Sequence, residues 1–200
     1  MAPRGVATPD VRERLFAAAE RLVERDGPGA LTSRAVTTEA GCAKGLLHAH
    51  FAGFDGFVAE LCLDRFARTA VKARALTDTA GRGTVERNLN AVALALFDSG
   101  GLALSGLAMS RPAATLAIRE ALEQGAPGFT EIQDAIAEYL RAERKLGRVA
   151  QTVDPPSVAL AVVGTAHHLL MTGRPGATDP RPLVTRLVSA LVPAPVPAGE

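Results

Sequence analysis

The chain has 200 residues, and 48% of them are hydrophobic, which is enough for one or two small domains with a buried core. Its 22 lysine and arginine residues nearly balance its 21 aspartate and glutamate residues, so the formal net charge is only +1. This balance excludes nucleic-acid binding through a general basic surface, and any such binding must be local. No apolar run is long enough to span a membrane, and the N-terminal residues lack the apolar core of a secretion signal.

The two cysteines, Cys42 and Cys62, are too few for a disulfide framework, and neither lies in a CxxC pair. Reduced thiols are typical of the cytoplasm, so we expect a soluble cytoplasmic protein with no membrane partner. A redox switch would require the fold to bring both thiols together. Because no neighbour in the sequence is suited to lower a thiol pKa, small buried packing residues are the favoured interpretation.

Apolar residues recur at helical spacing along the chain and no segment alternates as a strand does, so we expect an all-α fold. Thr8 and Pro9 are suited to begin the first helix, and the Gly-Pro-Gly stretch at residues 27–29 ends it. One face of this helix is apolar and should pack on the following segment. The other face is predicted to be solvated, and it carries Arg12, Arg14, Arg21 and Arg25 among acidic residues.

Residues 31–51 predict two short helices joined by a tight turn, which is a helix-turn-helix. Thr32 is placed to cap the first helix, Gly41 can adopt the left-handed conformation of the turn, and residues 44–50 are predicted to form the second helix. Four residues at helical spacing should hold the unit on the core: Val36, Ala40, Leu47 and Phe51. Such a unit can place its second helix in the DNA major groove.

A longer helix is predicted at residues 54–76, and the polar, glycine-containing stretch 78–83 separates it from the rest of the chain. Further helical segments, bounded by proline and glycine, are predicted at residues 84–98, 101–110, 112–124, 128–146, 155–171 and 180–191. The predicted division is a three-helix DNA-binding domain at residues 1–53, a connecting helix at 54–78, a C-terminal helical bundle for ligand binding and dimerisation at 79–192, and a disordered tail at 193–200.

The outward face of the second short helix carries the candidate DNA contacts. Lys44 can bind a phosphate or a guanine edge, Gly45 allows the backbone to approach closely, and Leu46 can contact a thymine methyl group. Taken singly, each residue is more simply an exposed position, but the set favours DNA. The predicted DNA-binding residues are Thr32, Ser33, Arg34, Ala43, Lys44, Gly45, Leu46, His48 and His50.

The order and spacing of these residues resemble the TetR family of transcriptional regulators, from the amphipathic first helix through Thr32, Gly41, Lys44 and Phe51 to a long helix. The resemblance covers about residues 9–61 and implies a repressor that binds a double-stranded DNA operator. It also implies that an unknown small apolar or amphipathic molecule in the C-terminal half moves the connecting helix and releases the operator. The coupling required is about 1 to 3 kcal/mol.

Three positions depart from the pattern that is usual in that family. Ala43 replaces the serine or threonine that caps the second helix, a loss of about 1 kcal/mol. His48 stands in place of a tyrosine, and Phe54 in place of a lysine, that commonly contact phosphate. The departures predict modest or salt-sensitive DNA affinity, or an unusual operator.

The C-terminal half supplies the candidates for effector binding and dimerisation. Most of the residues expected to line a pocket could equally fill the core; they are Phe97, Leu104, Leu107, Met109, Phe129, Ile132, Ile136, Tyr139, Val163, His167 and Met171. A single helix-turn-helix buries little DNA surface, so a homodimer is expected. Its interface is predicted on the last two helices, at Val158, Val162, Leu169, Leu183, Leu187 and Leu191.

No sequence motif indicates catalysis, a cofactor or a metal site, and we expect none. Adjacent His167 and His168 point about 100° apart on a helix, so they cannot together hold one metal ion, and core or interface histidines are the favoured interpretation. Two alternatives stay open. One is a helical small-molecule-binding protein or enzyme with a degenerate helix-turn-helix, and the other is an architectural or partner-binding protein without an effector.

Overall fold

The computed structural model describes residues 10–98, 100–173 and 178–193. These residues form ten α-helices and two 3-10 helices and contain no strand, which confirms the all-α prediction. The α-helices are α1 (Val11–Asp26), α2 (Ser33–Glu39), α3 (Leu46–His50), α4 (Gly53–Arg74), α5 (Val85–Ala95), α6 (Gly101–Met109), α7 (Pro112–Glu123), α8 (Phe129–Lys145), α9 (Pro155–Thr172) and α10 (Arg181–Leu191). The 3-10 helices are η1 (Pro28–Ala30) and η2 (Thr77–Thr79).

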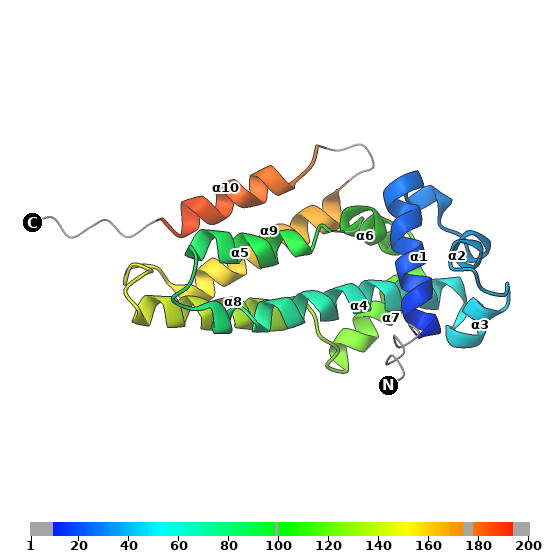
Figure 1. Ribbon diagram of the computed structural model, residues 1–200, viewed down its shortest axis with the longest axis horizontal. Coiled ribbons are helices and arrows are strands. Elements are labelled where there is room, and N and C mark those ends of the chain that lie inside the picture. The colour runs from blue at the N-terminus through cyan, green and yellow to red at the C-terminus, as the bar shows by residue number, and fades with distance from the viewer. Residues whose placement is uncertain (1–9, 99, 174–177, 194–200) are drawn as a thin grey trace, which may run out of the picture.

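The molecule is elongated, with α1, α2 and α3 gathered at one end and a helical bundle along the rest of its length (Figure 1). α4 joins both parts, because it packs on α3 and α6 and also runs beside α7 and α8. α8 lies against α9, and α10 covers α5 and α9. The observed helices agree with the predicted segments to within a few residues.

The buried apolar side chains form two clusters that do not follow the predicted domains. The N-terminal cluster combines the inner faces of α1, α2 and α3 with the first half of α4, and it also contains Leu104 and Ala108 of α6 and Ala114 of α7. The bundle cluster combines the second half of α4 with α5, α8, α9 and α10. α6 therefore packs with the N-terminal unit, although it follows the boundary placed near residue 79, because a polar turn marks a change of direction rather than a limit of packing.

α1 shows the apolar stripe that the sequence predicts, with Leu15, Leu22 and Val23 buried. It ends at Gly27, whose φ of 79° is left-handed, as the Gly-Pro-Gly stretch requires. The predicted helix start at Thr8 and Pro9 lies outside the described residues, and so do residues 194–200 of the tail predicted at 193–200. Across the described residues, none of the helices has both the length and the apolar character needed to cross a membrane.

Candidate nucleic-acid interface and ligand cavity

α2 and the turn that follows it are held by local polar contacts. The Thr32 hydroxyl accepts a hydrogen bond from the Ala35 N–H at 3.1 Å and caps the helix. The chain then turns at Gly41, whose φ is 63°, a conformation that strains a residue with a Cβ. The Cys42 N–H donates to the Thr37 carbonyl at 2.8 Å and closes the helix end. The predicted cap and the predicted turn are both confirmed.

α3 is shorter than predicted, because it begins at Leu46 rather than at residue 44. The Leu46 N–H donates to the Ala43 carbonyl at 3.0 Å, so Lys44 and Gly45 lie in a turn that leads into the helix. No side chain caps α3. Ala43 offers no oxygen to the unpaired N–H groups of the first turn, and this explains why the helix starts late.

Apolar side chains fix the two short helices on the core. Val36 and Leu47 are 0% exposed, whereas Ala40 is only half-buried. The Phe51 ring meets the Phe57 ring of α4 nearly edge-on, with 5.0 Å between centroids, and lies 5.6 Å from the Phe16 ring of α1. This aromatic cluster anchors the end of α3 to both neighbouring helices.

The nine predicted DNA-binding residues all lie on α2, on α3 or in the chain immediately flanking them. Ser33 and Leu46 are half-exposed, and the others are exposed: Thr32, Arg34, Ala43, Lys44, Gly45, His48 and His50. Arg34 and Lys44 form no ion pair with any described residue, so their charges are available to phosphate. The surface therefore combines two unpaired cations with two exposed histidines at the end of the molecule (Figure 1).

Two arginines of α1 that were predicted to be solvated are half-buried and bind the ends of the short helices. Arg14 Nη2 donates to the Ala40 carbonyl at 2.9 Å, and Arg12 Nη1 donates to the His50 carbonyl at 3.0 Å. These carbonyls lie at helix C-termini, where they lack helical partners and carry partial negative charge. The Arg12 guanidinium also lies 4.5 Å from the Phe51 ring centroid and pairs with Glu60 of α4. Each arginine thus holds one helix of the helix-turn-helix.

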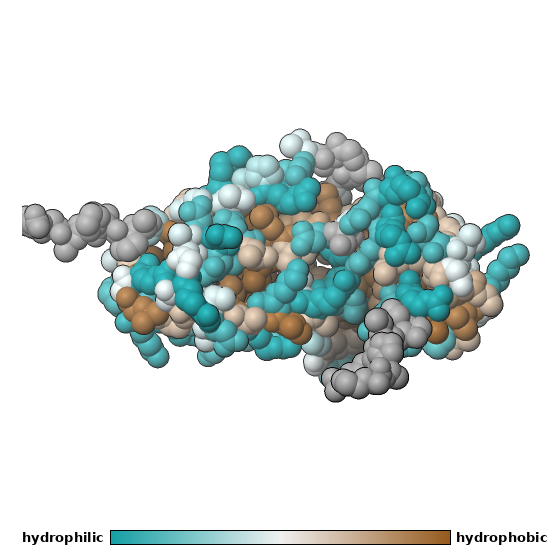
Figure 2. Space-filling view, viewed as in Figure 1, coloured by the Kyte–Doolittle hydropathy of each residue, from teal (hydrophilic) through white to brown (hydrophobic). Residues whose placement is uncertain are grey.

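The other two arginines of α1 pair with the last residue of α2. Glu39 accepts from Arg21 at 3.0 Å and from Arg25 at 3.2 Å, and these hydrogen bonds, Arg21 first, lower the Glu39 pKa. The hydrophilic surface over α1 in Figure 2 is therefore in part a set of contacts to the helix-turn-helix. Sequence analysis missed this role because the partners lie 14 to 38 residues away along the chain.

The start of α4 carries a charge supplied from the bundle. Phe54, which stands where the resemblance leads one to expect a lysine, has its ring 4.9 Å from the guanidinium of Arg111. Arg111 comes from the turn between α6 and α7 and also pairs with Asp55. A cation therefore lies beside the start of α4 even though Phe54 has none.

A cavity of about 200 Å³ lies between α4, α6, α7, α8 and α9. It is lined by Cys62, Phe66, Ser105, Ala108, Met109, Thr115, Ile118, Arg119, Leu122, Phe129, His167 and Met171. Cys62 and Ala108 belong to the N-terminal cluster and Phe66 to the bundle cluster. The cavity thus lies at the seam where the two clusters meet.

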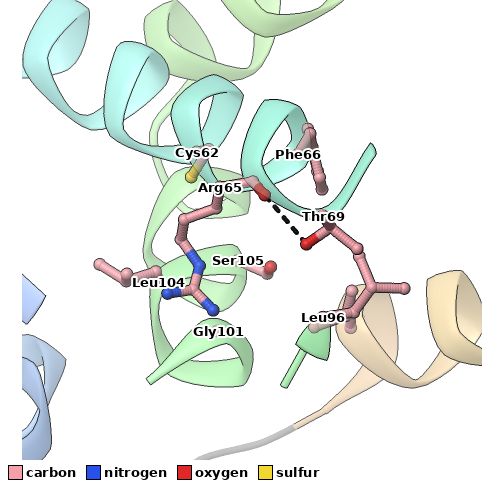
Figure 3. Close-up of a pocket in the computed structure, with 9 residues that line it drawn as sticks. Cys62, Arg65, Phe66, Thr69, Leu96, Gly101, Leu104 and Ser105 are labelled. Atoms are coloured by element: carbon pink, nitrogen blue, oxygen red, sulfur yellow. Dashed lines mark hydrogen bonds between the residues drawn. The ribbon is translucent and has the colours of Figure 1, made fainter. Parts of the chain in front are cut away.

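A second, water-sized cavity of about 10 Å³ shares Cys62, Phe66 and Ser105 with the first. Figure 3 shows Arg65 of α4 extending toward the first turn of α6 at Gly101. Arg65 donates to Glu20 of α1 at 3.1 Å and to the Asp98 carbonyl, and the Arg65 and Glu20 side chains are only 11% and 13% exposed. Arg65 therefore links α1, α4 and the chain that enters α6.

The eleven residues predicted to bind a ligand are divided among four environments. Met109, Phe129, His167 and Met171 line the larger cavity, and Leu104 lines the smaller one. Leu107 packs against the N-terminal cluster. The remaining five are buried in the bundle cluster and reach neither cavity: Phe97, Ile132, Ile136, Tyr139 and Val163. Their helical spacing marks a buried face but cannot say whether that face meets a core or a cavity.

Tyr139 illustrates the core alternative. It is 0% exposed, its hydroxyl accepts a hydrogen bond from Asn88 Nδ2 at 2.9 Å, and burial raises its pKa to about 12.

Sequence analysis missed the α7 wall of the larger cavity. Thr115, Ile118 and Leu122 follow an i, i+3, i+7 spacing that could have indicated it.

Four of the six predicted dimer residues face the chain's own bundle. Val158 and Val162 are 6% and 1% exposed, and Leu169 and Leu191 pack partly buried against the bundle cluster. Leu187 is half-exposed, and Leu183 is 46% exposed. The free face of α9 carries Leu160 instead, at 59% exposure, because two residues along a helix turn the side chain about 200°.

The described residues hold no group of three or more side chains that could bind a metal ion. Cys42 is half-exposed and Cys62 is buried, and both are free thiols. Burial raises the pKa of Cys62 to about 12, so this thiol stays protonated near neutral pH.

Residues 15–61 match the family model described as bacterial regulatory proteins, tetR family. No curated protein matches the chain in sequence. Among solved structures, the chain is similar to Escherichia coli NemR in its reduced form, with a TM-score of 0.62, 16% identity, and 94% of this chain and 99% of that one covered.

The fatty acid degradation regulator FadR from Bacillus halodurans gives a TM-score of 0.61 at 17% identity, covering 94% of this chain and 97% of that one. FadR from Bacillus subtilis in complex with stearoyl-CoA gives 0.59 at 15% identity, covering 90% and 97%. At these identities the likeness shows a shared fold over nearly the whole chain.

Proposed function

We propose, from the premise that residues 15–61 belong to the tetR family of bacterial regulatory proteins, that this chain is a cytoplasmic transcriptional repressor. It binds an operator in double-stranded DNA as a homodimer and is released by a small apolar or amphipathic ligand. The observation that carries the proposal is the helix-turn-helix, whose apolar side chains point into the core while Arg34, Lys44 and His48 face outward and form no ion pair with a described residue. The family match covers that same unit.

The exposed cations and donors supply the DNA contacts. Lys44 precedes α3 and is placed to bind a phosphate or a guanine edge, and His48 and His50 can donate to phosphate or base edges. Arg34 near the start of α2 can bind a phosphate on the backbone. With so few cations on each subunit, the DNA affinity of one subunit should be modest, and specific binding should require both subunits of a dimer.

The exposed faces of α9 and α10 support a two-fold interface. Leu160, Gly164 and His168 are exposed at i, i+4 and i+8 on α9, and beyond its chain neighbours and its own helix backbone no described atom lies within 4 Å of a Cβ placed on Gly164. α10 packs beside α9 and exposes Leu183. Paired across a two-fold axis, these faces would form a four-helix interface, with Leu160 in the place predicted for Val158 and Val162.

α6 is the element through which a ligand would reach the DNA-binding unit. Ser105, Ala108 and Met109 form one wall of the cavity, while the chain entering α6 is held by Arg65. The chain leaving α6 places Arg111 on the start of α4. A ligand that wedges the cavity open would displace both contacts and shift α4, which changes the spacing of the paired α3 helices. The solved neighbour with stearoyl-CoA supports an amphipathic effector.

Fluorescence anisotropy with labelled duplex DNA from the region upstream of the gene tests the proposal. We expect binding at low salt, and Lys44→Ala should raise the Kd about tenfold and reduce its salt dependence. Lys145→Ala, at the end of α8, is the matched control because it removes an exposed lysine outside the helix-turn-helix.

Absence of DNA binding at low salt, or equal affinity for both variants and the unmodified chain, would overturn the proposal. Turnover or ligand binding without any DNA footprint would then favour the helical small-molecule-binding protein or enzyme.

A further inference from the structure

The charges around the cavity narrow the class of effector, an inference that rests on the proposed function. The larger cavity is lined by Arg119 and His167, and no carboxylate appears among the described residues that line it. The smaller cavity also has no carboxylate among its described lining residues, and its Arg65 already binds Glu20 and the Asp98 carbonyl. A ligand ammonium group would therefore find no counter-charge, whereas a carboxylate would find guanidinium and imidazole N–H donors.

Both donors of the larger cavity lie at its mouth, where an anionic group can keep part of its hydration. Arg119 on α7 and His167 on α9 are exposed although they line the cavity. The nearest acid to Arg119 is Glu123, at 3.7 Å with both side chains 69% exposed. Such a surface pair is weak in water, so the guanidinium can turn toward a ligand.

The interior of the cavity is apolar and aromatic. The Phe66 and Phe129 rings lie 4.8 Å apart, and the His167 ring meets Phe129 at 4.9 Å with an interplanar angle of 64°. These rings can receive a further aromatic ring in an offset or edge-on arrangement. Met109 and Met171 adapt their shape to the rest of the ligand. The cavity thus suits a ligand whose apolar part lies inside and whose anionic group lies at the mouth.

The volume of the cavity limits the size of the ligand's apolar part. An apolar cavity of about 150 Å³ in another protein accommodates benzene, so the 200 Å³ available here correspond to about eight non-hydrogen atoms. One substituted aromatic ring fills this space, whereas a long alkyl chain exceeds it.

We propose that the effector is a small monoanionic organic acid whose apolar part has about the size of one aromatic ring. Its carboxylate is held by Arg119 and His167 at the mouth, and its ring lies against Phe66 and Phe129.

Isothermal titration calorimetry on the full chain with benzoate, benzamide and benzamidine tests the charge, because the three probes share one shape and are anionic, neutral and cationic. We expect benzoate to bind at least tenfold more tightly than benzamide, and benzamidine to bind weakest. Arg119→Gln should lower the affinity for benzoate about tenfold and leave that for benzamide unchanged. Arg141→Gln, an exposed arginine on α8 outside the cavity, should change neither.

Hexadecanoate tests the size and should bind no more tightly than benzoate. Equal or tighter binding of benzamide or benzamidine, an unaltered benzoate affinity in Arg119→Gln, or a gain of tenfold or more with hexadecanoate would each overturn the proposal.

Operator binding measured in parallel separates this proposal from the proposed function. If the chain binds DNA but does not prefer benzoate to benzamide and benzamidine, the proposed effector class is wrong and the proposed function as a DNA-binding regulator stands. If benzoate binds with the expected preference but does not displace DNA, the class stands and the release mechanism is wrong.

Discussion

The DNA-binding end of the molecule and the bundle end are stabilised in different ways. α3 spans only residues 46–50, which is far too short to be stable alone, and its geometry depends on charged side chains from α1 that bind helix ends. The bundle is held by long helices around fully buried side chains such as Ile132, Ile136 and Leu140. A polar contact from Arg12 and the packing of Leu47 and Phe51 thus together set the orientation of α3, whereas apolar packing sets the bundle and leaves a cavity where the two clusters meet.

The largest effect should come from removing a core side chain at each end. Leu47→Ala and Ile136→Ala, both 0% exposed in the folded chain, should each lower the free energy of unfolding by about 2 to 5 kcal/mol, as measured by urea denaturation. We expect only Leu47→Ala to abolish operator binding under conditions where both variants are folded. Val71→Ala, 56% exposed, is the control and should stay within about 0.5 kcal/mol. Retained DNA affinity in Leu47→Ala would show that α3 is oriented by something else.

Alanine substitutions at two glycines of α6 should change the stability in opposite directions, and they test how tightly the chain is packed where the two clusters meet. A Cβ at Gly101 would lie 2.3 Å from the Leu96 carbonyl oxygen and 2.7 Å from Arg65 Nη2, so Gly101→Ala should cost about 1 to 3 kcal/mol of stability. Apart from chain neighbours and the backbone of α6 itself, no described atom lies within 4 Å of a Cβ at Gly106, and Gly106→Ala should gain about 0.5 to 1 kcal/mol. Thermal unfolding measures both, and a stabilising Gly101→Ala would mean that the seam has room to spare.

Two threonine caps, one at each end of the molecule, should each contribute about 1 kcal/mol to the free energy of unfolding. Thr32 accepts from Ala35 N–H at the start of α2, and Thr84 accepts from Arg87 N–H at the start of α5. Either alanine variant should lower the unfolding free energy by that amount. Only Thr32→Ala should also raise the operator Kd, and an equal rise in Thr84→Ala would indicate that the bundle controls α3 more directly than its contacts suggest.

The smallest effects concern pH. Hydrogen bonds from Arg21 and Arg25 lower the Glu39 pKa, and the hydrogen bonds from Ser157 lower the Asp154 pKa. A lowered folded-state pKa contributes stability above the unfolded value of about 4, and this stability is lost as the pH falls through the folded pKa.

Urea midpoints measured between pH 7 and pH 3 should therefore fall less steeply in Glu39→Gln and in Asp154→Asn than in the unmodified chain. Hydrogen exchange should locate the effect of Glu39→Gln in α2 and that of Asp154→Asn in α9. An unchanged pH dependence in both variants would show that other carboxylates dominate.

Local features of the DNA-binding end were predictable because their causes are local. A threonine before α2 and a glycine after it act within a few residues, and the family model matches the segment that contains them. The late start of α3 follows from Ala43, which the sequence shows to lack a capping oxygen, but its extent was not foreseen. The contacts of Arg12, Arg14, Arg21 and Arg25 were missed because pairing over 14 to 38 residues requires the fold.

By itself, the sequence determined the helical class, the order of the helices and the inward and outward faces of the helix-turn-helix, since helical periodicity and caps are properties of short segments. Only the tertiary structure decided which apolar faces of the bundle helices fill the core, which line a cavity and which are exposed. Ile136 fills a core, Phe129 lines a cavity and Leu160 faces outward, although all three are apolar residues on helices. The physical reason is that periodicity reports which side of a helix is apolar, while the neighbouring helices decide whether that side is packed, hollow or exposed.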